Sequence, residues 1–532
     1  MKAVAAILLF FAPALAGVTL EAPPSSVRRF EIAEYTVRVT SPKFQNPFSD
    51  AQFTGEFTRH GAPPSYVCGF ADSQDGRIFR LRFSPEVAGE TYRYVLRFRA
   101  PGIDQTFKGE LWSADSTLPG PVVVDSEHPK HFIFAGTRKP AYILGYTSYH
   151  LLDPSNDDAQ VDATIAYCAR QGFNRIRFLL TGYPRDFEGR STADSEQGVP
   201  DPWRRPNYGS KPGRVNPLPA WVGKPHAYDF TRFNVAYWRR VDRAVREMRE
   251  HTIVASCIFT IEKQDLPMEY GRLTENELRL YRYAIARLAA FDNVWWDLGN
   301  EHNEYRDAAW GNAMGAVVKA LDPYRRLASV HGYEDFRYSS SEWADFISTQ
   351  QYGDEKKVNA WVLKYWPVPK PYINEEYGYE GYLDRPGHLQ NTDWVRRCHW
   401  AIAMAGGYAT YGDWSGGTSW YYMGVPGPGV AARQLEHLRA FFEALPFPEM
   451  VPENELTDEG FCLAHPPDVY VFYFPHGGTC RIDLSRSRGR MVAWWYDPRV
   501  GSFQHGPAVT AATNTVVAPA PGDWVLLVRG AQ

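Results

Sequence analysis

The sequence predicts a multidomain protein in which a central barrel of eight parallel strands and their helices lies between two β-sandwich domains. The chain has 532 residues, and because one hydrophobic core stops growing well below that size, roughly two to four domains are expected. Residues 18–120 and 445–532 show the short alternating runs of antiparallel strands. Residues 130–440 instead alternate apolar strands with helical periods, which is the pattern of a parallel α/β domain.

The N-terminal alternation has a period of two. Between residues 92 and 99 one face carries Tyr92, Tyr94, Leu96 and Phe98, and the three arginines occupy the other. Residues 79–83 repeat this pattern, which predicts a β-sandwich with solvated outer faces. The arginines are therefore interpreted as the solvent-exposed face of the sheet. The net charge of −4 does not indicate a basic surface for nucleic acid.

The central region contains eight candidate strands with near-continuous apolar composition, separated by helices. Thr274 and Glu277 form a capping box before one helix, and apolar residues at helical spacing from Tyr237 to Met248 mark another. Strands of this composition form parallel sheets covered by helices, and eight units over roughly 300 residues fit a closed TIM barrel, (β/α)8. The candidate strands are residues 142–146, 174–180, 253–260, 294–300, 327–331, 346–352, 372–376 and 407–411.

Two of these strands end in carboxylates. The strand that begins at Val294 ends in Asn300-Glu301, and a later strand ends in Glu375-Glu376. Barrel enzymes collect functional groups at the carboxyl ends of their strands, so groups far apart in sequence meet in one mouth. A retaining glycosidase needs one carboxyl group to protonate the leaving oxygen and a second, about 5–5.5 Å away, to attack the sugar carbon. The sequence therefore predicts cleavage of O-glycosidic bonds by double displacement.

Adjacent residues of a strand point to opposite faces, so only one of Glu375 and Glu376 is expected to line the mouth. Arg177 can keep the nucleophile ionised, Tyr352 can donate its hydroxyl, and Asn300 can hold the sugar 2-hydroxyl. For Arg177 a purely structural ion pair is the alternative, and Asp297 can pair either with Arg177 or with another cation of the barrel. Further residues at strand ends can contact sugar hydroxyls or stack on a sugar ring, with ordinary packing as the alternative: His150, His302, His331 and Trp414.

Residues 1–16 read as an export signal, with Lys2, an apolar centre and an Ala-x-Ala cleavage site that ends at Ala16. A secreted or periplasmic location is expected, without a membrane span after the signal is removed.

Six cysteines form a poor disulfide framework, although Cys462 and Cys480 flank a strand pair and can bridge. Without a metal-binding motif, no metal or organic cofactor is expected. Residues 181–230 are interpreted as a wall of the binding site, or else as an ordered surface excursion.

The arrangement resembles the large clan of retaining glycoside hydrolases built on β/α barrels, and within it the secreted bacterial apiosidase-like and cellulase-like members. Those members carry an immunoglobulin-like N-terminal domain and a C-terminal β-sandwich named as collagen-binding. The resemblance covers nearly the whole mature chain. It rests on Asn46-Pro47-Phe48, Gly69-Phe70, Arg82-Phe83-Ser84-Pro85, Gly145-Tyr146-Thr147, Gly172-Phe173-Asn174 with Arg177, Gly299-Asn300-Glu301, Glu376-Tyr377-Gly378-Tyr379-Glu380-Gly381 and Trp494-Trp495-Tyr496-Asp497-Pro498.

The resemblance implies that Glu301 is the acid/base and Glu376 the nucleophile, and it adds Tyr146 to the substrate-binding residues. The spacing from the preceding proline and the Tyr-Gly that follows favour Glu376, with Glu375 as the alternative. Gln351 stands where many clan members have histidine, and some apiosidase-like enzymes use aspartate as the acid, so the sugar does not carry over.

The expected substrate is a plant or microbial polysaccharide or oligosaccharide, bound by a monomer. The competing hypothesis is a non-catalytic carbohydrate-binding or adhesion protein on an inactive barrel. A polysaccharide lyase would need a Tyr/His base and a cation for the uronate, and nothing singles out such a set. The presence of both carboxylates favours the hydrolase.

Overall fold

The computed structural model describes residues 17–153, 156–181, 219–224, 227–261, 267, 272–333, 335–385, 387–417 and 419–531. The expected signal segment and most of the long connection after the second candidate strand, including Trp203, lie outside the described residues. The chain divides into two compact units. One comprises residues 1–116 with 231–235, and the other comprises residues 117–230 with 236–532.

The first unit contains two sheets that share one core. Tyr92, Tyr94, Leu96 and Phe98 are buried in that core, as the period-two pattern predicts. In one sheet the order is β1 (Val18–Leu20), β3 (Ala33–Val39), β7 (Ile78–Phe83) and β6 (Phe70–Ala71). In the other it is β2 (Ser26–Arg28), β9 (Ile103–Ala114), β8 (Glu90–Ala100), β4 (Gln52–Thr58) and β5 (Ser65–Cys68).

The second unit is built on a curled parallel sheet, and each of the eight candidate strand segments overlaps one of its strands. The described part of this sheet has nine strands, because the fifth candidate segment holds one short strand and a second short strand begins at Gly332, just after that segment. Their order is β18 (Ala328–Ser329), β17 (Val294–Asp297), β16 (Val254–Ile258), β13 (Arg175–Leu179), β12 (Leu144–Thr147), β24 (Tyr408–Tyr411), β21 (Tyr372–Glu376), β20 (Ile347–Gln350) and β19 (Gly332–Tyr333).

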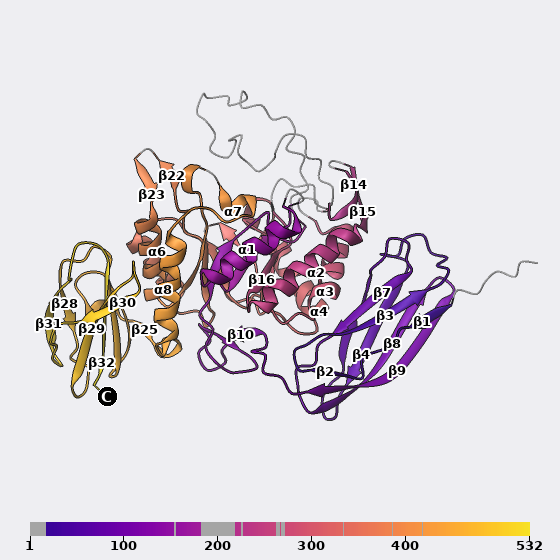
Figure 1. Cartoon of the computed structure of the whole chain (residues 1–532), viewed down its shortest axis with the longest axis horizontal. Helices are drawn as coiled ribbons and strands as arrows, with labels where there is room; N and C mark the ends of the chain where they lie inside the picture. Colours follow the sequence, from indigo (N-terminus) through magenta and orange to yellow (C-terminus); the bar gives the residue numbers. More distant parts are fainter. Residues whose placement is uncertain are drawn as a thin grey trace, which may run out of the picture. The chain divides into compact units, whose positions relative to one another are not determined.

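Helices follow these strands and lie around the sheet (Figure 1). The predicted capping box is present, because the Thr274 hydroxyl accepts a hydrogen bond from the Glu277 amide at 3.0 Å. The predicted apolar face from Tyr237 to Met248 is buried. The helices are α1 (Asp158–Arg170), α2 (Val235–Glu250), α3 (Glu275–Leu288), α4 (Ala308–Leu321), α5 (Glu355–Tyr365), α6 (Thr392–Met404), α7 (Trp420–Met423) and α8 (Ala431–Glu443).

Several short elements lie outside this parallel sheet. Three antiparallel pairs are formed by β10 (Val122–Val124) with β11 (Phe132–Phe134), β14 (Trp221–Lys224) with β15 (Ala227–Phe233), and β22 (Tyr382–Arg385) with β23 (His388–Gln390). Single 3₁₀ turns are η2 (His302–Glu304), η3 (Ser415–Gly417), η4 (Phe447–Glu449) and η5 (Asn454–Leu456).

The C-terminal strands form two antiparallel sheets around a second apolar core, which includes Cys462 and Cys480 as free thiols. The larger sheet has the order β25 (Val451–Pro452), β26 (Phe461–His465), β27 (Val469–Phe474), β32 (Trp524–Gly530), β29 (Met491–Asp497) and β30 (Ser502–His505). The smaller sheet pairs β28 (Thr479–Asp483) with β31 (Thr513–Val517).

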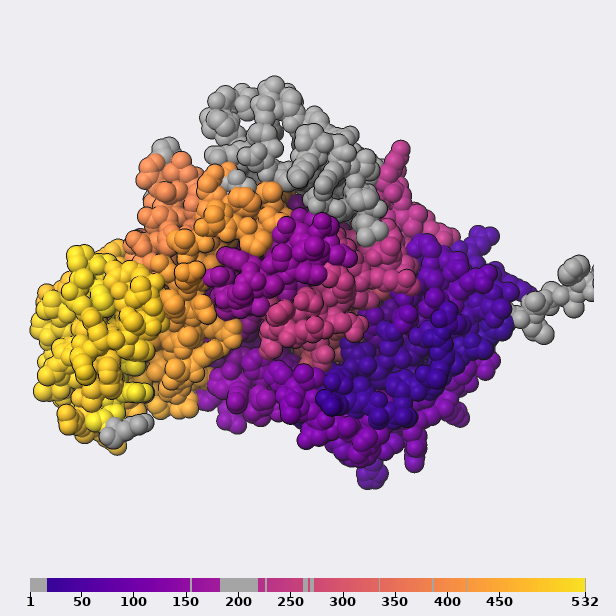
Figure 2. Space-filling model, viewed as in Figure 1, coloured from indigo at the N-terminus to yellow at the C-terminus, as the bar shows by residue number. Residues whose placement is uncertain are grey.

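A buried ion pair joins these C-terminal strands to α6. The Arg396 guanidinium donates to both carboxylate oxygens of Asp523, at 2.9 and 2.5 Å, and both side chains are 1% exposed. Beside it the Trp400 ring stacks on Tyr473 at 5.4 Å between centroids. In the space-filling view the yellow C-terminal strands accordingly lie against the orange segment that contains α6 (Figure 2).

Candidate active site

An irregularity in β21 brings two neighbouring carboxylates to the same face of the sheet. Along the β20–β21 ladder Thr349 pairs with Asn374, but the next residue of β20, Gln350, pairs with Glu376. Glu375 is therefore the extra residue of a β-bulge, which interrupts the alternation of side chains between the two faces. The two side chains therefore do not point to opposite faces, as a regular strand would require. That only one of them lines the mouth stays a prediction.

Two arginines of β13 receive these carboxylates in two layers. Arg175 and Arg177 are two residues apart on one strand, so their side chains lie on the same face. In the lower layer the Arg175 guanidinium donates to both oxygens of Glu375 at 2.8 Å, and Thr410 adds a hydrogen bond at 2.7 Å. Burial alone would raise the pKa of Glu375, but Arg175, Arg177 and the hydrogen bonds lower it below its ordinary value. Glu375 is thus held as a buried, ionised structural partner.

Glu376 occupies the upper layer at the carboxyl end of β21. The hydroxyls of Tyr149 and Tyr379 each donate a short hydrogen bond to its carboxylate, one to each oxygen. The Tyr352 hydroxyl lies 3.4 Å from Oε2, and the Arg177 guanidinium lies 3.7 Å from Oε1. Glu376 therefore sits among three tyrosine hydroxyls and a shared cation, and 5% of its surface is exposed.

Burial is the largest effect on the pKa of Glu376 and raises it above the ordinary value of 4.5. Arg177 and the hydroxyls of Tyr149 and Tyr379 act in the opposite direction, because they stabilise the ionised form. These groups oppose the effect of burial but do not outweigh it, and the charge of the neighbouring Glu375 also raises the pKa.

Asn300 is oriented by donors from three elements. Its side-chain oxygen accepts a hydrogen bond from Arg177 at 2.7 Å, and it lies 2.8 Å from the Tyr149 hydroxyl oxygen and 2.8 Å from Nδ1 of His331. Arg177 also donates to Asp297 at 3.0 Å, so of the two possibilities left open for Asp297 the pair with Arg177 is present. With its oxygen engaged, Asn300 turns its amide NH₂ group toward the residue that follows it.

That residue, Glu301, begins the short turn η2 in the left-handed region, with φ 44° and ψ 39°. Non-glycine residues adopt this conformation rarely, and such strain clusters at functional sites. The Glu301 amide lies 3.4 Å from Nδ1 of His331, and Asn300 Nδ2 lies 3.4 Å from Oε2 of Glu301. The side chain is partly exposed, as a group that meets a substrate must be.

The charges of Glu301 and Glu376 act on the same two tyrosine hydroxyls. Burial raises the pKa of both Tyr149 and Tyr352 well above 10, and the negative charges of Glu376 and Glu301 raise it further in both cases. Both tyrosines therefore lie within electrostatic reach of both carboxylates. The two glutamates predicted to act together are brought to one place, despite their separation along the chain.

The three predicted histidines differ in what they can offer. His302 lies 2.9 Å from the His331 carbonyl through Nδ1 and 2.9 Å from the Tyr338 hydroxyl through Nε2, which leaves neither ring nitrogen for a sugar. His331 is fully buried, and burial lowers its pKa well below 6.5. The His150 ring packs against Tyr422 at 4.3 Å, and burial lowers its pKa to about 4. All three are therefore neutral at pH 7.

Two predicted binding residues are buried against other aromatic side chains. Trp414 is 3% exposed, with its ring centroid 5.0 Å from that of Tyr382. Tyr146 is fully buried, and its ring contacts Phe173 at 5.1 Å and Tyr167 of α1 at 6.1 Å, on the helix-covered side of the sheet. Tyr146 does not join the group around Glu376 and is left out of the proposed site.

Sequence reasoning missed Tyr149 and Tyr379, the two hydroxyls that contact Glu376 most closely. Each follows a predicted strand by a few residues, in Tyr146-Thr147-Ser148-Tyr149 and in Glu376-Tyr377-Gly378-Tyr379. Strand-end position was the available signal, but it does not say which of several tyrosines turns inward.

Within the described ranges, no group of three or more His, Cys, Asp or Glu side chains could hold a metal ion. No described helix combines the length and the apolar character needed to cross a membrane.

Three family models match the chain. The model of the apiosidase-like catalytic domain matches residues 127–449. The DUF5060 domain of unknown function matches residues 26–99, and the "Putative collagen-binding domain of a collagenase" matches residues 446–529. No curated protein sequence matches the chain.

Solved structures with a similar fold include two glycoside hydrolases. A crystal structure described as a "putative glycoside hydrolase from Bacteroides vulgatus" is 21% identical, with a TM-score of 0.74, over 95% of this chain and 99% of that chain. A second, described as "Glycoside hydrolase", is 20% identical, with a TM-score of 0.59, over 78% of this chain and 97% of that chain. At these identities the likeness shows a shared fold.

Proposed function

Because the chain belongs to the apiosidase-like family, we propose that it is a secreted retaining glycoside hydrolase acting on a plant or microbial polysaccharide or oligosaccharide. Its fold and family are those of glycoside hydrolases. The observation that carries the proposal is the environment of Glu376, a buried carboxylate held by tyrosine hydroxyls that are also within reach of Glu301.

In this proposal the reaction has two displacements. Glu301 protonates the glycosidic oxygen while the Glu376 carboxylate attacks the anomeric carbon, so the bond to the leaving group breaks and an ester to Glu376 forms. Glu301, now ionised, then takes a proton from water as the water oxygen attacks the same carbon and releases Glu376. Arg177 and the hydroxyls of Tyr149 and Tyr379 stabilise the carboxylate before the first step and after the second.

We also infer that the parallel sheet closes into a TIM barrel, although its ladder is not continuous. The end strands β18 and β19 are separated only by Val330 and His331. In addition, the Asp345 amide just before β20 donates to the carbonyl of Ala328 in β18 at 2.8 Å. If the sheet closes at this segment, the carboxyl ends of all its strands surround one opening. The two carboxylates that follow β17 and end β21 then face the same opening, as the proposed reaction requires.

The test starts with a screen of aryl glycosides and cell-wall polysaccharides for turnover by the wild-type protein. Glu301→Gln and Glu376→Gln are each expected to lower kcat by about 10²-fold or more while leaving the circular dichroism spectrum unchanged. NMR of the first product should show retained anomeric configuration. Azide should rescue Glu376→Gly and yield a glycosyl azide.

Glu375→Gln, which can perturb stability, provides the register control. Loss of turnover in Glu375→Gln with full turnover in Glu376→Gln would reverse the assignment of the nucleophile. Inverted product stereochemistry would reject double displacement. Saturable binding of polysaccharide without turnover by the wild type would favour the non-catalytic alternative.

A further inference from the structure

The proposed acid/base, Glu301, begins a turn that has to be held in place by its surroundings. Its backbone lies in the left-handed region, with φ 44°, and a non-glycine residue keeps such a conformation only where the neighbouring structure fixes it. The next residue, His302, starts η2 and is 2% exposed. The contacts of His302 therefore decide how the backbone of Glu301 is held.

The hydrogen bonds of His302 determine which of its ring nitrogens carries the proton. Its backbone amide donates to the His331 carbonyl at 3.1 Å, and its Nδ1 lies 2.9 Å from the same oxygen. Because a carbonyl oxygen only accepts, Nδ1 must be protonated. Burial lowers the pKa of His302 to about 4, so the ring is neutral at pH 7 and Nε2 is the nitrogen that accepts.

The Tyr338 hydroxyl supplies the donor that this tautomer needs. Its oxygen lies 2.9 Å from Nε2 of His302. Tyr338 is fully buried, and burial raises its pKa above the ordinary value of 10, so the hydroxyl keeps its proton and donates it. Without this donor, Nε2 would be left as a buried acceptor, which is unfavourable. Tyr338 and the His331 carbonyl thus hold the imidazole from its two sides.

Two glycines of α4 make room for the Tyr338 ring. Gly311 and Gly315 lie about one turn apart, on the same face of α4. A Cβ at Gly311 would lie 2.2 Å from the Tyr338 hydroxyl oxygen, and a Cβ at Gly315 would lie 2.1 Å from the Trp343 ring. Trp343 packs edge-on against Tyr338, with 5.0 Å between centroids. Glycine is unfavourable inside a helix, so these two positions favour close packing of Tyr338 over the stability of the helix itself.

We propose that Tyr338 is a positioning residue for Glu301 and acts through His302. Its hydroxyl keeps the His302 imidazole in one tautomer and one orientation, and that ring holds the start of η2 against the His331 carbonyl. The backbone of Glu301 then stays in the conformation that presents its carboxyl group to the glycosidic oxygen. This inference rests on the proposed role of Glu301 as the acid/base.

The contact itself is tested by nitrogen NMR of the full-length protein labelled in its histidines. The His302 signals are assigned by their loss in His302→Gln. In the wild type, Nδ1 should show the shift of a protonated nitrogen and Nε2 that of a hydrogen-bonded acceptor. Tyr338→Phe keeps the ring and removes the donor, so the Nε2 signal should move downfield. This measurement needs no turnover.

The role in catalysis is tested with substrates that differ in their leaving group. A glycoside of a weakly acidic phenol needs a proton from Glu301, whereas a dinitrophenyl glycoside of the same sugar departs without one. Tyr338→Phe should lower kcat/KM for the first substrate about five- to tenfold, as expected for the loss of one hydrogen bond. It should leave kcat/KM for the dinitrophenyl glycoside close to the wild-type value. A general loss of folded protein would lower both values equally.

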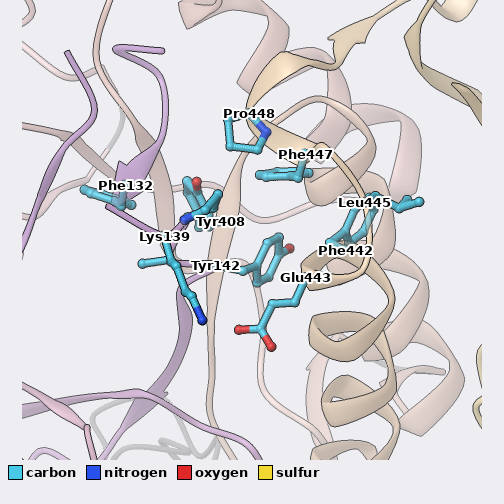
Figure 3. A pocket seen from close by; sticks show the side chains of 11 residues that line it. Phe132, Lys139, Tyr142, Tyr408, Phe442, Glu443, Leu445, Phe447 and Pro448 are labelled. Atoms are coloured by element: carbon cyan, nitrogen blue, oxygen red, sulfur yellow. The ribbon is translucent and has the colours of Figure 1, made fainter. Parts of the chain in front are cut away.

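Two further Tyr→Phe variants are matched controls. The Tyr365 hydroxyl accepts a hydrogen bond from the Phe336 amide at 2.8 Å, in the same connection between β19 and β20 that carries Tyr338. Tyr142 lines a cavity near the amino ends of the parallel strands (Figure 3), and its hydroxyl makes no hydrogen bond within the described chain. Tyr365→Phe should lower Tm without changing the ratio of the two kcat/KM values. Tyr142→Phe should leave both values unchanged.

Two results would overturn the proposal: an unmoved Nε2 signal of His302 in Tyr338→Phe, and equal losses of kcat/KM for the two substrates. A change of the ratio in Tyr365→Phe as large as that in Tyr338→Phe would also overturn it, because the effect would then belong to the whole connection. Absence of turnover by the wild type would reject the proposed function and with it the catalytic role of Tyr338, whereas the NMR result reports only on the contact with His302.

Discussion

Tyr149→Phe tests the role of the hydroxyls around the proposed nucleophile. The substitution keeps the ring and removes the proton donated to Glu376. Because the hydroxyl stabilises the ionised carboxylate, its loss must raise the pKa of Glu376 further above 4.5. Nothing replaces it directly, although Tyr379 and Arg177 remain in place.

The size of the effect follows from hydrogen-bond energetics. A hydrogen bond to a charged group contributes about 1.5–3 kcal/mol, and one pKa unit corresponds to about 1.4 kcal/mol. The Tyr149 proton is also within reach of the Asn300 oxygen at 2.8 Å, so only part of its stabilisation belongs to Glu376. We therefore expect an upward shift of about one pKa unit. Loss of the same contact should lower kcat/KM on the plateau about tenfold.

The assay is the pH dependence of kcat/KM, whose acidic limb reports the carboxylate that must be ionised in the free enzyme. In Tyr149→Phe that limb should move to higher pH by about one unit. Tyr146→Phe is the matched control, because it removes a buried hydroxyl without a partner, three residues earlier. An unmoved or downward-shifted limb in Tyr149→Phe, or an equal shift in Tyr146→Phe, would refute the role given to this hydroxyl.

The other predictions concern buried ion pairs. Arg175→Met leaves the Glu375 charge buried without its partner and should reduce the free energy of unfolding, measured by urea denaturation, by about 3–5 kcal/mol. The double variant Arg175→Met/Glu375→Gln should recover part of this stability, and no recovery would contradict the pairing. The pKa of Glu375 is lower in the folded state than in the unfolded state. The stability that its ionised carboxylate contributes is therefore present above the unfolded pKa near 4.5 and is lost as the pH falls through the lower folded pKa. The Tm difference between wild type and Glu375→Gln should shrink on acidification, and a difference that grows would contradict this sign. Asp523→Asn should loosen the contact between α6 and the C-terminal strands and speed proteolysis there, whereas Asp393→Asn, at the 58% exposed partner of the same Arg396, should not.

The sequence predicted the parts of this fold that depend on local pattern. Each of the eight predicted strand segments overlaps a strand of the parallel sheet, because buried parallel strands must be apolar along their whole length. Thr274 caps its helix because only a side-chain oxygen at that position can satisfy the free amides of the first turn. These features need no knowledge of distant residues. The pairing of Arg177 with Asp297, in contrast, was one of two open possibilities until the structure placed the two side chains 3.0 Å apart.

The candidate site was predictable only in part, because its details depend on the long-range register. The bulge at Glu375 has no signature in Asn374-Glu375-Glu376 and arises from how β20 pairs with β21. Tyr146 was included through the family resemblance, and Tyr149 was missed because nothing local distinguishes it. The two differ by three residues, and only the curvature of the chain after β12 decides which ring turns toward Glu376.

The bulge also explains why Glu376 rather than its neighbour suits covalent chemistry. Arg175 forms two hydrogen bonds with Glu375, and Arg177 is engaged by Asp297 and Asn300, so neither cation is dedicated to Glu376. A carboxylate neutralised by a bidentate arginine would be a poor nucleophile, because attack would have to break both charge-assisted bonds. Hydroxyl donors stabilise the anion less and can rotate away as the charge moves to the sugar. Arg175 and Arg177 thus face three carboxylates, and the one that they neutralise least is Glu376. It lies at the strand ends, where we propose that a substrate binds.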